Sequence, residues 1–158
     1  MERLVAIDVW DKKSCMESDN ELTDFKHLFD IYKIIKHIGD EKFDRDSKIY
    51  FNTSENDIKP HKSITHWHRM DWCQYNKNFF SNNTIYLCGM HLGICIDEFY
   101  EDIISGTNGI QGIEAFIILN ASIVSPWNNI SDVINFDKFK YVWYNYHDNS
   151  MTPIKNMF

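Results

Sequence analysis

The segment that decides the fold is Tyr86–Ile96, which has the sequence YLCGMHLGICI. Its apolar start predicts a buried strand that stops at Gly89, followed by a short turn and a helix that begins at Cys95. A thiol at a helix N-terminus lies at the positive end of the helix dipole, which favours the thiolate and therefore a nucleophile. Main-chain N–H groups of the same turn can stabilise a developing oxyanion. A cysteine packed beneath the start of a helix is the alternative, and spacing alone leaves both open.

The pattern on either side of this segment predicts alternating strands and helices. Nearly continuous apolar runs predict buried strands at 3–9 and 114–121, and shorter segments indicate strands at 48–53 and 84–88, with 64–68 as a further candidate strand. Apolar residues at helical spacing predict helices at 21–38, with Gly39 as its stop, and at 94–104, ended by Gly106 and Gly109. This alternation is typical of an α/β fold with a mostly parallel sheet between helices. Ligands bind such sheets beyond the carboxyl ends of the strands, where Asp8 and the loop 89–95 fall.

Length and charge narrow the class of protein. The 158 residues fit one domain spanning 1–158, and the chain is 44% hydrophobic, enough for a buried core. A net charge of −7 with scattered lysines argues against a nucleic-acid partner and against an anionic membrane surface. No apolar run approaches the roughly 20 residues of a membrane-spanning helix, and no signal peptide is visible. We therefore expect a soluble, cytoplasmic protein.

The cysteines and the C-terminal tail leave alternatives open. Four irregularly spaced cysteines form no CxxC motif, so no zinc knuckle is indicated, and a reducing compartment would keep them as thiols: Cys15, Cys73, Cys88 and Cys95.

The tail 126–158 is rich in aromatic residues that predict a last helix or strand, and periodicity does not decide between them. An apolar face on 136–146 would suit self-association, so we expect a homo-oligomer.

Two separated motifs resemble those of the isochorismatase-like cysteine hydrolases. The stretch Val5–Cys15 (VAIDVWDKKSC) is similar to the family's first motif, in which a strand ends in an acid. The matching residues of this motif are Asp8, Trp10, Asp11, Lys12 and Cys15. The stretch Ile85–Ile96 resembles the second motif, with the cysteine six residues after a glycine, and matches it at Gly89, His91 and Cys95. The resemblance covers about residues 4–122 and keeps the family's order of elements.

This resemblance implies a fold, a reaction and a set of site residues. The fold would be a single-domain, three-layer α/β/α structure with a cis peptide bond between Gly89 and Leu92. Asp8 would exchange a proton with the thiol of Cys95, which would attack an amide-type carbon of a small molecule. The family's catalytic lysine has Lys62 as its candidate here. Further residues would contact the substrate: Trp10, His91, Trp67 and Arg69.

Departures from the family pattern define the competing hypotheses. The family's lysine usually ends the third strand, whereas Lys62 precedes the predicted strand and Arg69 follows it. An arginine is a poor proton-transfer group, because its pKa lies above about 12. The acid often found after the next strand is replaced by Asn120. A protein that keeps the pocket to bind or sequester a small molecule, or that serves as an interaction module, is therefore the alternative to an active hydrolase.

A metal is a further hypothesis, although a cofactor-free protein is our first expectation. Members of the family that hydrolyse nicotinamide bind a metal through one Asp and several His residues at about this point in the chain. The candidate ligands here are Asp57, His61, His66 and His68. His66 and His68 would share one face of a strand, which makes them a feasible pair for a divalent metal. Of the three tryptophans that suggest an aromatic substrate box, Trp10, Trp67 and Trp72, we expect about two to fill the core.

Overall fold

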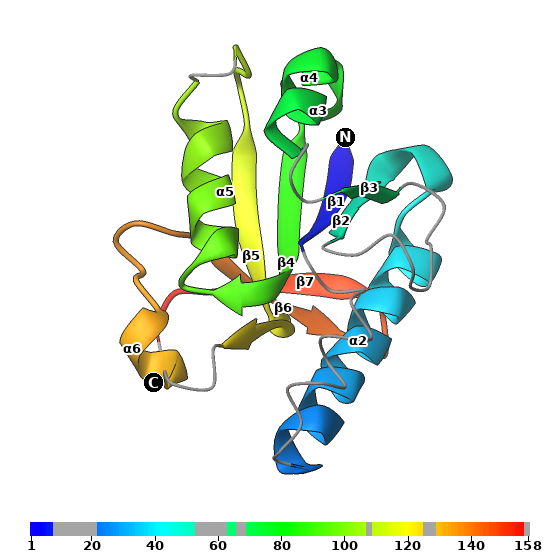
Figure 1. The fold of residues 1–158 in the computed structure, drawn as a ribbon, viewed down its shortest axis with the longest axis vertical. Coiled ribbons are helices and arrows are strands. Elements are labelled where there is room, and N and C mark those ends of the chain that lie inside the picture. Colours follow the sequence, from blue (N-terminus) through cyan, green and yellow to red (C-terminus); the bar gives the residue numbers. More distant parts are fainter. Residues whose placement is uncertain (8–21, 53–62, 66–68, 107–108, 125–128, 157–158) are drawn as a thin grey trace.

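The fold is built around one sheet whose strands are mostly parallel (Figure 1). A computed structural model describes residues 1–7, 22–52, 63–65, 69–106, 109–124 and 129–156. The strands of the described residues are β1 (Glu2–Ile7), β2 (Lys48–Asn52), β3 (Ser63–Thr65), β4 (Thr84–Leu92), β5 (Glu114–Val124), β6 (Tyr141–Asn145) and β7 (Ser150–Ile154). They lie in the order β3-β2-β1-β4-β5-β6-β7, and within this set the antiparallel pair is β6 with β7. The predicted α/β class is confirmed.

The described helices connect these strands. They are α2 (Leu22–Lys42), the short 3₁₀ helix η1 (Arg45–Ser47), α3 (Arg69–Tyr75), α4 (Lys77–Phe80), α5 (Cys95–Ile104) and α6 (Ile130–Val133). Figure 1 shows α2 and α5 on opposite sides of the central strands. None of the described helices is long and apolar enough to cross a membrane.

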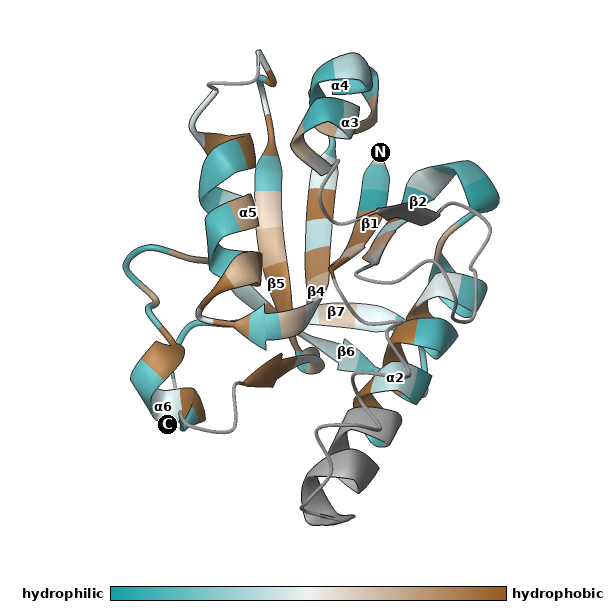
Figure 2. Ribbon diagram, viewed as in Figure 1, coloured by the Kyte–Doolittle hydropathy of each residue, from teal (hydrophilic) through white to brown (hydrophobic). Residues whose placement is uncertain are grey.

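The central strands β1 and β4 are buried on both faces, which explains their continuous apolar sequence. Val5 and Ile7 of β1 belong to a core cluster that also contains Phe99 of α5 and Phe80 of α4. The alternate β1 residues Leu4 and Ala6 face a second cluster, which includes buried residues of α2. Brown, apolar colour accordingly runs along β4 and β5 in Figure 2, while the helices alternate between brown and teal.

Gly39 does not end the long helix, and this part of the prediction is wrong. Helix α2 continues through Gly39 to Lys42. A Cβ atom built on Gly39 would collide with the hydroxyl of Tyr50, which is buried in β2. Glycine is present because helix and strand approach closely at this point, so its role is packing and not termination.

Replacing Gly39 tests this assignment. In an exposed helix, Gly→Ala stabilises by about 1 kcal/mol, but forcing atoms into a packed core costs about 1–3 kcal/mol. We expect Gly39→Ala to lower the free energy of unfolding by about 1 kcal/mol, measured by urea denaturation. In a Tyr50→Phe background, which removes the colliding hydroxyl, the same change should become neutral or stabilising. An equal loss in both backgrounds would contradict the assignment.

Gly89 likewise lies inside a strand and does not close it. Strand β4 runs on to Leu92, with Gly89 at φ 116° pairing with Ile7 of β1 and Ser122 of β5. The register with β5 shifts between Leu87 and Gly89, which marks an irregularity of the bulge type. The glycine allows the backbone to bend while it stays hydrogen-bonded, and the strand thus extends towards Cys95.

The aromatic tail completes the sheet. Residues 141–145 and 150–154 form β6 and β7, with Tyr141 and Tyr144 each 1% exposed in the two core clusters. Of the two alternatives left open by the sequence, helix or strand, these residues of the tail form strands. Trp143, between the two tyrosines, is 48% exposed.

Candidate functional site

The site lies where the order of strands reverses. From β1 the chain proceeds outward to β2 and β3, then returns to place β4 on the other side of β1. Such a switch point is where open α/β sheets bind ligands, beyond the carboxyl ends of the strands. Here β1 ends at Ile7, paired with Gly89, and β4 continues to Leu92 before α5 begins. Asp8 follows Ile7 directly in the sequence, and Cys95 follows β4 by three residues.

Cys95 is the first residue of α5, as predicted. It is half-buried against the core cluster of Phe99 and forms no disulfide. The residue that caps the helix is Ile94, whose side chain has no hydrogen-bond acceptor for the first turn. The positive end of the helix dipole therefore lies beside this thiol without a side-chain cap from Ile94.

The turn before Cys95 has a defined backbone. The Met90–His91 peptide is cis, which confirms the expected cis bond between Gly89 and Leu92. The N–H of Ile94 donates to the carbonyl of His91 at 3.1 Å. His91 is half-buried, and burial lowers the pKa of its imidazole, so the neutral ring predominates at pH 7. A neutral imidazole can donate one hydrogen bond and accept another, which suits contact with a polar ligand.

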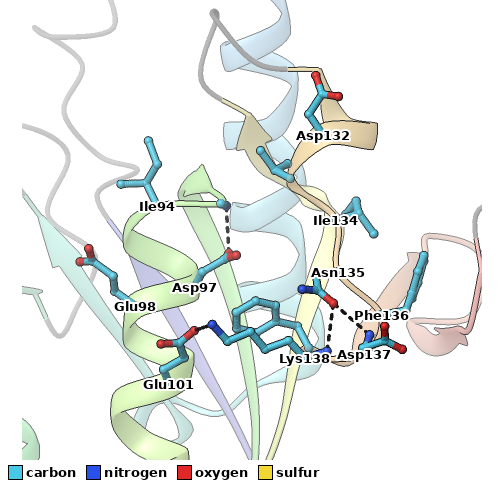
Figure 3. Close-up of a pocket in the computed structure, with 13 residues that line it drawn as sticks. Ile94, Asp97, Glu98, Glu101, Asp132, Ile134, Asn135, Phe136, Asp137 and Lys138 are labelled. Carbon is cyan, nitrogen blue, oxygen red and sulfur yellow. Dashed lines mark hydrogen bonds and ion pairs between the residues drawn. The ribbon is translucent and has the colours of Figure 1, made fainter.

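Two acids in the first turn of α5 act on the thiol in the opposite sense to the dipole. Asp97 and Glu98 bring negative charge near Cys95, which disfavours a thiolate. The carboxylate of Asp97 accepts a hydrogen bond from the N–H of Gly93 at 2.9 Å (Figure 3). Burial raises the pKa of the Asp97 carboxyl, while the Gly93 hydrogen bond lowers it. The electrostatic stabilisation of a Cys95 thiolate is thus smaller than the helix dipole alone would give.

The other described cysteines are structural. Cys73 and Cys88 are fully buried, and the thiol of Cys88 donates to the carbonyl of Val5 at 3.8 Å. Burial raises the pKa of the Cys88 thiol well above its usual range, which keeps it protonated and unreactive. Cys95 is the most accessible of the three described thiols.

Several predicted site residues fall outside the part of the chain that the structure describes. They are Asp8, Trp10, Asp11, Lys12, Cys15, Asp57, His61, Lys62, His66, Trp67 and His68. Arg69 is described only as the first residue of α3. The described residues therefore bring Cys95 and His91 to one turn, and the predicted roles of the others stay predictions. Among the described residues, no group of three His, Cys, Asp or Glu side chains could hold a metal ion.

Trp72, a candidate for the aromatic box, and Asn120, which replaces the acid of the family pattern, both have structural roles. Trp72 packs edge-on against Phe51, Phe79 and Phe80, with ring centroids 5.3–5.9 Å away, so it is partly buried against the core cluster. Asn120 donates to the carbonyl of Tyr144 and accepts from its N–H, both at 2.9 Å. Asn120 therefore ties β5 to β6 like a main-chain amide, a role that an acid could not fill with both atoms.

A cavity of about 640 Å³ lies beside α5 (Figure 3). Gly93 and Ile94 of the cysteine turn line it, together with apolar side chains and five carboxylates: Asp97, Glu98, Glu101, Asp132 and Asp137. The cation Lys138 is paired with Glu101 at 2.5 Å. Cys95 is not among the lining residues described, so this cavity is not assigned to the substrate.

Fold and turn together define an α/β protein with a half-buried cysteine at the switch point of its sheet. Comparison with protein-family models, with curated proteins and with solved structures finds no match for this chain.

Proposed function

We propose that this protein is an isochorismatase-like cysteine hydrolase that cleaves a C–N bond of a small molecule. The observation that carries the proposal is the position of Cys95, which begins α5 beyond the carboxyl end of β4, next to the strand that precedes Asp8. The strand order and the helices on both faces support the three-layer form of this fold. The motif residues of the sequence supply the rest of the argument.

The proposed reaction proceeds in two steps. The carboxylate of Asp8 accepts the proton of the Cys95 thiol, and the thiolate attacks the carbonyl carbon of an amide. The C–N bond breaks, the amine leaves with the proton from Asp8, and a thioester remains on Sγ. Water then attacks the thioester with Asp8 as base, which releases a carboxylic acid and restores the thiol. Lys62 would stabilise the charged states of this exchange, and His91 would contact the substrate.

The thioester provides a direct test. Wild-type protein is incubated with a panel of small primary amides, quenched in acid, digested and analysed by mass spectrometry. We expect an acyl adduct on the peptide that contains Cys95, together with release of ammonia. Adducts spread equally over peptides with Cys73 or Cys88, or no ammonia from any amide, would contradict the proposal.

A binding protein that keeps the fold without turnover is the second candidate. It is favoured by Asn120, which occupies a position where the family often has an acid and is committed to β6. It is favoured as well by the two acids beside Cys95. Recovery of a bound ligand unchanged, with the same affinity in Cys95→Ser, would support this candidate and exclude the hydrolase.

The reaction is proposed to take place in the cytoplasm, on a small-molecule substrate and without a nucleic-acid partner. Self-association into a homo-oligomer is proposed as well, supported by the exposed Trp143 and Tyr146 of the aromatic tail, each 48% exposed. Light scattering of wild type and of a Trp143→Ser, Tyr146→Ser variant tests this part separately.

A further inference from the structure

The turn that carries Cys95 is held from two sides at Gly93. On one side, the carboxylate of Asp97 accepts the Gly93 N–H at 2.9 Å (Figure 3). On the other, the side chain of Val133 in α6 occupies the space where Gly93 has none. A Cβ atom on Gly93 would lie 2.8 Å from Val133, and its φ of 87° also favours glycine. The backbone before Cys95 is therefore fixed by groups outside the turn.

The carboxylate of Asp97 does not serve as an ordinary helix cap. An acid at the third helical residue commonly accepts from the N–H of the capping residue itself. Here the capping residue Ile94 donates to the carbonyl of His91 instead, and Asp97 reaches one residue further back, to Gly93. The hydrogen bond thus joins the first turn of α5 to Gly93, the residue that follows β4, across Cys95.

The neighbouring acid provides a contrast. Glu98 is exposed and contributes negative charge to the same turn of helix, whereas Asp97 is half-buried and bonded to Gly93. In Figure 3 the two side chains point in different directions from α5. Loss of charge near Cys95 can therefore be separated from loss of the hydrogen bond to Gly93.

We propose that Asp97 is a positioning residue, whose hydrogen bond to Gly93 fixes the direction of the Cys95 thiol relative to the carboxyl end of β4. The inference rests on the proposed function, in which that thiol is the nucleophile. Misplacing a reacting group by about 1 Å can cost on the order of 100-fold in rate, so a single clamp on this turn has a measurable effect.

Four variants and two readouts test the role of Asp97. Asp97→Asn removes the charge but keeps an oxygen that can accept from Gly93, Asp97→Ala removes both, and Glu98→Ala removes charge alone. Asp97→Ser, whose side chain is shorter, is a second variant without the contact. The readouts are alkylation of Cys95 by iodoacetamide, followed by peptide mass spectrometry, and kcat and KM for ammonia release. Thermal unfolding checks that each variant is folded.

We expect Asp97→Asn and Glu98→Ala to alkylate at rates within about threefold of each other, and Asp97→Ala to be on the order of tenfold slower than Asp97→Asn. In the amide assay, kcat should fall in Asp97→Ala with KM unchanged. Equal alkylation rates in Asp97→Ala, Asp97→Ser and Asp97→Asn would overturn the positioning role. Absence of ammonia release in the wild type would contradict the proposed hydrolase, and the alkylation rates would still decide the role of Asp97.

Discussion

Cys95→Ser is expected to lower kcat/KM for amide hydrolysis by at least about 10³-fold, because the alkoxide that replaces the thiolate is inaccessible near pH 7. The change is nearly isosteric and falls on a half-buried residue at the start of α5, so the free energy of unfolding should change little. The measurement is ammonia release from those small primary amides that the wild type hydrolyses. Circular dichroism confirms that the variant is folded.

Cys88→Ser is the matched control for this prediction. It is the same chemical change on the strand that leads to Cys95, but the Cys88 thiol is fully buried and donates to Val5. A serine hydroxyl can keep that donor, so activity per folded molecule should stay within about threefold of wild type. Equal losses in Cys88→Ser and Cys95→Ser would show that the effect is structural and would falsify the assignment of Cys95 as nucleophile.

The positions of the strands were predictable because a parallel strand covered on both faces needs a continuous apolar sequence. Strands β1, β2 and β5 begin within one residue of the predicted starts, and α5 begins at Cys95, as the motif predicts. The ends were less predictable at Gly39 and Gly89. In both places the glycine serves a long-range contact, with Tyr50 or with β1, that no local pattern records.

The C-terminal tail shows a second limit of prediction from sequence periodicity. Tyr141 and Tyr144 are three residues apart, which fits one face of a helix as well as the two faces of a strand buried on both sides. The structure buries them on opposite faces of β6, and this depends on β5 and β7 as neighbours. Periodicity alone could not distinguish a helix from a strand, because both arrangements bury these two tyrosines.

The candidate site likewise contains features that could be predicted from the sequence and one residue that could not. Cys95 and the cis peptide before it were predictable from the motif YLCGMHLGICI and its resemblance to a family. Asp97 was not, although an acid two residues after the cysteine is the third residue of the helix, where capping acids are common. Its contact with Gly93 depends on the positive φ of that glycine, a property of the folded turn.

The largest effect on stability is expected at the aromatic core that α4 forms with its neighbours. Phe80 is fully buried, and its ring lies 5.1 Å from Phe79, 5.9 Å from Trp72 and 6.2 Å from Phe99 of α5. Phe80→Ala removes these contacts and leaves a cavity, so the free energy of unfolding should fall by about 3–5 kcal/mol in urea denaturation.

The control for this variant is Tyr75→Ala, an aromatic residue of the adjoining helix α3 that is 87% exposed. Its removal should change the free energy of unfolding by no more than about 0.5 kcal/mol, because little apolar surface leaves the core. Similar losses in Phe80→Ala and Tyr75→Ala would mean that α3 and α4 do not pack as described. A large difference would show that the Phe80 ring stabilises the fold through its contacts with Trp72, Phe79 and Phe99.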